Sequence, residues 1–67
     1  MELTKEQKQA VIDERLAQWT HSLYGHTVDM RVGKSAGFDD VVTSATANAK
    51  RAQIMIDALE KERAGLD

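Results

Sequence analysis

The chain has 67 residues, no cysteine and no proline, and 9 basic against 11 acidic side chains give it a net charge of −2. This composition excludes disulfide bonds and thiolate metal sites, and the two charge signs are spread too evenly for an acidic tail or a nucleic-acid arm. No apolar run approaches the roughly 20 residues that span a bilayer, and the start Met-Glu-Leu-Thr-Lys does not predict a signal peptide. We expect a single small helical domain over residues 1–67, located in the cytoplasm and not in a membrane.

Large side chains for a hydrophobic core are scarce. Phe38, Tyr24 and Trp19 are the only aromatic residues, so the core must consist mainly of aliphatic side chains and alanine. A chain of this size buries only about 60% of the surface that its unfolded form exposes. Such chains are usually stabilised by disulfides, a metal or oligomerisation. Because cysteine is absent, association with a partner or with further copies is the expected source of stability.

The first periodic segment predicts a helix over about residues 4–24. Thr4 and Gln7 have the spacing of a capping box, in which each side chain satisfies a backbone N–H of the first turn. The apolar residues of its core face follow at intervals of four, three and four, namely Ile12, Leu16, Trp19 and Leu23. Gly25 comes directly after this face and is expected to end the helix in the left-handed conformation.

The second periodic segment predicts a longer helix over about residues 38–64. Its seam repeats every three or four residues, as in heptads, through Phe38, Val42, Ala45, Ala49, Ala52, Ile56 and Leu59. Asp39 and Asp40 complement the helix dipole at its start. The β-branched and hydroxyl-rich run at 41–46 lowers helix propensity, so a start within that run is the alternative.

The segment between the helices, at about 26–37, is expected to be a short extended or β-hairpin connector. Apolar and polar residues alternate from Val28 to Val32, which is a strand pattern, and residues 33–37 can form a turn. If residues 38–42 pair back as a second strand, the fold is helix, β-hairpin, helix. Otherwise the second helix starts near Phe38. In both cases the sequence predicts a mainly α chain, with the two helices forming an antiparallel hairpin.

The short motifs do not predict catalysis or a cofactor. Gly-Lys-Ser at 33–35 matches the end of a phosphate-binding loop, but Val28 stands where the first glycine of that loop is required. Asp39 and Asp40 are adjacent, and adjacent residues on a helix do not face each other as paired carboxylates. We therefore expect no catalytic residue, no cofactor and no enzymatic activity.

Two further groups of residues favour ordinary structural roles. His21 and His26, with Asp29 nearby, could ligate a metal, but their spacing puts them on either side of the expected helix end. Lys50 and Arg51 could contact phosphates, but acidic residues share their helix and the pI is about 5.6. We expect no metal ion, and we expect the basic residues to lie on a solvated helix face.

The second helix has more apolar surface than one neighbouring helix can cover. The alanines of its seam allow another helix to approach closely. A second, offset apolar line consists of Ala47, Ile54 and Ala58, and Met55 lies between the two lines; these four residues are the candidate interface. Since the first helix covers only one of the two lines, we expect the other to be an interface. Tolerated surface apolarity, which is common, is the alternative.

The order of segments is similar to that of a known family. The first helix ends at Leu23-Tyr24-Gly25, an alternating segment follows from His26 to Val32, and the closing helix ends with residues 56–62. This layout resembles the small head-to-tail joining proteins of tailed phages, of the lambda W type. The resemblance implies a helix–β-hairpin–helix fold and a ring subunit at the portal vertex, between the packaged head and the tail. It also implies a location in the virion.

Three functions are compatible with these features. The preferred hypothesis is a non-enzymatic protein–protein interaction or assembly module that acts through the Ala/Ile/Leu seam. It would be a homo-oligomer or a subunit of a larger assembly, such as a phage head–tail joining subunit. The second hypothesis is a small phage or bacterial inhibitor or regulator that binds a host or defence protein, or sequesters a ligand at an oligomer interface. The third is a nucleic-acid-binding module.

Overall fold

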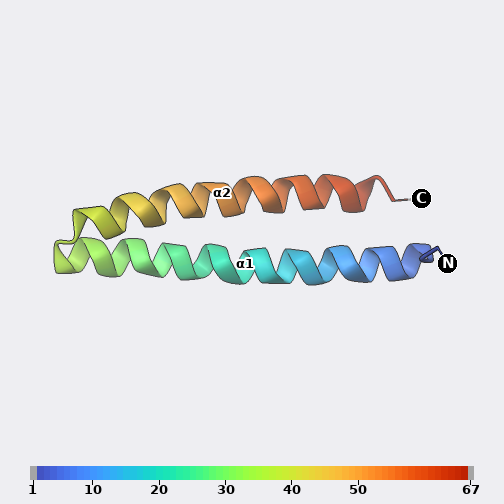
Figure 1. The fold of residues 1–67 in the computed structure, drawn as a ribbon, viewed down its shortest axis with the longest axis horizontal. Coiled ribbons are helices and arrows are strands. Elements are labelled where there is room, and N and C mark those ends of the chain that lie inside the picture. Colours follow the sequence, from blue (N-terminus) through green and yellow to red (C-terminus); the bar gives the residue numbers. More distant parts are fainter. Residues whose placement is uncertain (1, 67) are drawn as a thin grey trace.

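The computed structural model describes residues 2–66 as two helices joined by a tight turn (Figure 1). Helix α1 spans Lys5–Ala36 and helix α2 spans Asp39–Ala64. The helices run side by side in opposite directions, so both ends of the chain lie at the same end of the molecule (Figure 1). The predicted antiparallel hairpin is confirmed. Its Cα atoms extend over 51 × 16 × 14 Å, which makes the molecule a rod.

The start of α1 is the predicted capping box. The Thr4 side-chain oxygen accepts a hydrogen bond from the Gln7 backbone N–H at 3.1 Å. The Thr4 backbone N–H in turn donates to the Gln7 side-chain oxygen at 2.9 Å. Two N–H groups that the first helical turn leaves unpaired are thereby satisfied.

The predicted helix end at Gly25 and the extended or β-hairpin connector at 26–37 are wrong. Helix α1 continues to Ala36, and residues 2–66 contain no strand, so the β-hairpin implied by the phage-family layout is also not formed within them. The reason is that the seam of α1 does not stop at Leu23. It continues at the same intervals of three and four through His26, Met30 and Gly33, which are partly or fully buried. A glycine inside a helix costs about 1 kcal/mol relative to alanine, and further turns of contact with α2 offset that cost.

The turn between the helices depends on Gly37. Its φ of 79° lies in the left-handed region, which glycine adopts without steric cost. The Gly37 N–H donates to the Lys34 carbonyl at 3.3 Å, and the Phe38 N–H donates to the Gly33 carbonyl at 2.8 Å. These two bonds form a Schellman motif, which satisfies carbonyls of the last turn of α1. Helix α2 then begins at Asp39, close to the predicted start.

The core is a single seam between the two helices. In the part of the chain that the structure describes, its buried hydrophobic side chains are Ile12, Ala45, Ala52 and Ile56. Six further residues predicted for the core seam are only partly buried: Leu16, Trp19, Leu23, Val42, Ala49 and Leu59. No large side chain among the described residues is completely buried. The hairpin is therefore stabilised by a narrow strip of contacts and not by an enclosed core.

The helices approach each other closely next to the turn because Gly33 has no side chain. A Cβ placed on Gly33 would lie 2.9 Å from Val41 Cγ1 and 3.3 Å from Val42 Cγ2. At the open end of the hairpin, Arg63 Nε donates to Asp13 Oδ1 at 2.7 Å. Both side chains of this ion pair are about half exposed, so it contributes at most about 1 kcal/mol. Neither helix in the described part of the chain has the length and apolar character needed to cross a bilayer.

Candidate protein interface

The Gly-Lys-Ser segment at 33–35 lies in the last turns of α1. Its backbone N–H groups belong to a helix and not to a loop that could surround a phosphate. Gly33 itself is buried against Val41. The structure thus gives this segment a packing role at the close approach of the two helices.

The two histidines lie on different sides of α1. Five residues in an α-helix correspond to a rotation of about 140°, so His21 is exposed while His26 is partly buried in the seam. Among residues 2–66, no group of three histidine, aspartate or glutamate side chains is arranged to hold a metal ion. Asp39 and Asp40 lie in the first turn of α2, where they complement the helix dipole.

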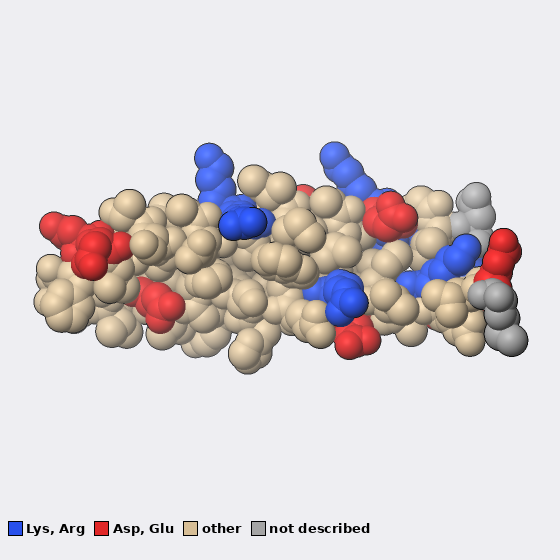
Figure 2. All heavy atoms as spheres, in the orientation of Figure 1, with Lys and Arg blue, Asp and Glu red and all other residues tan. Residues whose placement is uncertain are grey.

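The basic side chains are distributed along both helices. Arg63 is paired with Asp13, and Lys50 and Arg51 lie along the middle of α2, away from Arg63. On the face drawn in Figure 2, lysine and arginine do not form a continuous strip, and wide areas over both helices carry no charged side chain. The face in this view is therefore not the basic face that is typical of nucleic-acid-binding domains.

Exposed apolar side chains are the most prominent surface feature. The large ones are Leu3, Val11, Tyr24, Val32, Phe38, Val41, Ile54 and Met55. The four residues predicted as an interface, Ala47, Ile54, Met55 and Ala58, are all exposed, with Ile54 at 59%. They lie on the side of α2 that α1 does not cover. The residues predicted for the core seam, by contrast, lie between the helices, except Phe38, which precedes the first turn of α2 and is 59% exposed, so its predicted place in the seam is wrong.

Half of the exposed large apolar side chains belong to one long face of the hairpin. When the seam residues are assigned to heptad positions a and d, Val11 and Val32 occupy position c of α1. Val41 and Met55 occupy position g of α2. Positions c and g of two antiparallel helices lie on the same side of the pair. We call this side the Met55 face. It also includes Ala58, at position c of α2. The opposite side, at positions b and e, has Tyr24 and mostly polar and charged residues.

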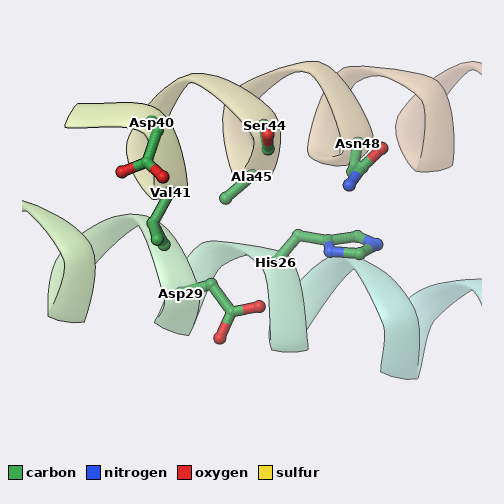
Figure 3. Close-up of a pocket in the computed structure, with 7 residues that line it drawn as sticks. All are labelled: His26, Asp29, Asp40, Val41, Ser44, Ala45 and Asn48. Atoms are coloured by element: carbon green, nitrogen blue, oxygen red, sulfur yellow. The ribbon is translucent and has the colours of Figure 1, made fainter. Parts of the chain in front are cut away.

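A hollow of about 260 Å³ opens on the Met55 face near the turn (Figure 3). It is lined by His26, Asp29, Asp40, Val41, Ser44, Ala45 and Asn48. Asp29 comes from α1 and Asp40 from α2, and no lysine or arginine lines the hollow. The two carboxylates make the lining acidic, and Ser44 and Asn48 add a hydroxyl and an amide group.

No protein-family model matches this chain, and no curated protein and no solved structure has a significant match to it. The geometry of the described residues therefore carries the functional argument.

The sequence did not predict Val11 and Val32 as interface residues, and it did not predict the acidic hollow. The signal that identifies them is the heptad position. Val32 falls on the same side of α1 as Val11 only if the helix passes through Gly25 without a break. Because the helix was expected to end at Gly25, Val11 and Val32 were not predicted to share one side of it.

Proposed function

We propose that this chain is a non-enzymatic protein-interaction module that serves as a building block of a larger assembly. The proposal rests on one observation: more large hydrophobic side chains are exposed than hydrophobic side chains are buried. Among residues 2–66, four hydrophobic side chains are buried and eight large ones are exposed. Exposed apolar patches on small proteins commonly mark sites of protein–protein contact. The expected location is the cytoplasm, or the virion if the assembly is a phage particle.

The surface available to a partner differs from the seam favoured by the sequence. Helix α1 covers the Ala/Ile/Leu seam of α2, as the burial of Ala45, Ala52 and Ile56 indicates. A partner could reach that seam only if the hairpin opened. The exposed line with Ile54 and Met55 at its centre is accessible without any rearrangement. We therefore assign partner binding to this line and to the surface beside it.

The proposal is tested by capturing the protein from cells of its source organism and measuring the stoichiometry of the complexes. Met55→Lys places a charge on the exposed apolar surface of α2, and Thr20→Lys places the same charge on an exposed polar position of α1. We expect a stoichiometric protein partner, either a second copy or another protein, which Met55→Lys removes and Thr20→Lys retains. A chain that stays monomeric and captures no stoichiometric protein would contradict the proposal.

A further inference from the structure

We propose that the Met55 face binds a second copy of this chain in antiparallel orientation. The result is a four-helix bundle in which Arg15 of each copy enters the acidic hollow of the other. This inference rests on the proposed function and specifies its partner.

The exposed area of the hairpin fits a dimer. The accessible surface is 5332 Å², whereas a compact folded chain of 7.4 kDa exposes about 4,200 Å². The excess is roughly 1,100 Å², and a stable protein–protein interface buries about 800 Å² on each partner. One face of a rod 51 Å long offers an area of that order. The hairpin thus exposes about as much additional surface as one such interface covers.

The residues of α1 on this face are arranged symmetrically about Ser22. Val11 and Val32 lie eleven and ten residues from Ser22, on either side of it. Arg15 and Asp29 each lie seven residues from it. A twofold axis that crosses α1 at Ser22 brings α1 of one copy against α1 of the other, running in the opposite direction. Val11 then meets Val32, and Arg15 meets Asp29.

The position of Met55 along α2 is consistent with the same twofold axis. Asp13 pairs with Arg63 at the open end, and Gly33 lies against Val41 near the turn. These two contacts fix the relative register of the helices, and they place Met55 level with about residue 20 of α1. Two residues along a helix correspond to about 3 Å, so Met55 lies close to the axis. It therefore meets Met55 of the second copy at the centre of the interface.

The charges on the face are complementary under this symmetry. The hollow contains Asp29 and Asp40 and opens on the Met55 face near the turn. The antiparallel arrangement places Arg15 of the second copy opposite it. A guanidinium group has five N–H donors and binds a carboxylate strongly through two parallel hydrogen bonds, which suits it to an acidic lining. Within one chain, Arg15 makes a single side-chain hydrogen bond among the described residues, to Gln18 at 3.3 Å, so it has donors to spare.

Charge reversal tests the ion pair. Arg15→Glu and Asp29→Arg each place like charges together, and because the contact occurs twice in a twofold dimer, each variant should raise the dimer dissociation constant at least about tenfold. The double variant Arg15→Glu/Asp29→Arg restores opposite charges and should return the constant to within a few-fold of the original. Arg31→Glu, at position b on the opposite side, is the matched control and should have no effect. Sedimentation equilibrium gives these constants.

Cysteine cross-linking tests the orientation, since the chain has no cysteine of its own. Met55→Cys should form a disulfide-linked dimer on mild oxidation. Val11→Cys mixed with Val32→Cys should form the mixed dimer, and neither variant alone should cross-link efficiently. Efficient self-cross-linking of Val32→Cys, or a double charge variant that fails to recover, would overturn the antiparallel arrangement. A chain that is monomeric throughout but binds a different protein would overturn the inference and leave the proposed function intact.

Discussion

The most informative perturbation is alanine substitution at two glycines of α1. Gly25→Ala adds a methyl group at a position with no atom within 4 Å of the new Cβ. Since glycine inside a helix costs about 1 kcal/mol relative to alanine, this variant should be more stable by about that amount. For a domain of this size the melting temperature should rise by about 4–8 °C.

Gly33→Ala gains the same helix propensity but is expected to lose more through overpacking. Its Cβ would lie 2.9 Å from Val41 Cγ1 and 3.2 Å from Val41 Cβ. Rotation of the Val41 side chain can relieve the first contact but not the second, so the helices must move apart. Overpacking costs about 1–3 kcal/mol, and Gly33→Ala should therefore be less stable than Gly25→Ala by that amount.

Urea and thermal unfolding followed by circular dichroism, at one protein concentration, measure both differences. Equal stability of the two variants would refute the close approach next to the turn. If Gly25→Ala were destabilised instead, the combination of a continuous α1 and open space beside Gly25 would be contradicted.

Three further predictions concern the turn, the seam and the open end of the hairpin. Gly37→Ala should destabilise the hairpin by about 1–2 kcal/mol, because alanine is strained at a φ of 79°; an unchanged unfolding midpoint in urea would contradict the described turn. Ala52→Leu should overpack the seam at a completely buried position and cost about 1–3 kcal/mol, whereas Ala47→Leu on the exposed side should change thermal stability little. Asp13→Asn should cost less than about 1 kcal/mol, since its ion pair with Arg63 is half exposed; a larger loss in a denaturation curve would show that the open end is more firmly held than the geometry indicates.

Periodicity predicted the helices where the apolar pattern is strong. The seam of α2 from Val42 to Leu59 and the capping box at Thr4 were sufficient to predict the antiparallel hairpin. The extent of α1 was missed because its seam changes composition after Leu23. From there the seam positions are filled by a histidine, a methionine and a glycine, of which only the methionine is apolar, so the apolar periodicity becomes weak. Val28 to Val32 also alternates like a strand, and one sequence cannot show that contact with α2 decides in favour of helix.

Part of the candidate interface, the exposed line on α2, was also predicted from the sequence. The exposed line of Ile54 and Met55 follows from the pattern of α2 alone, because two apolar lines on one helix cannot both face a single neighbour. The contribution of α1 to the Met55 face depends on the register between the helices. That register is determined by the glycine turn at Gly37 and by the close approach at Gly33, and neither can be derived from spacing within one helix.

The most direct test of the central claim is the dependence of the melting temperature on protein concentration. If folding and association of two chains are coupled, mass action stabilises the folded dimer as concentration rises. For two chains of 67 residues the melting temperature should increase by about 5 °C for each tenfold increase in concentration. A melting temperature that stays constant over a thousandfold range, with the helices intact, would show that the hairpin is a self-sufficient monomer and would contradict self-assembly through its exposed face.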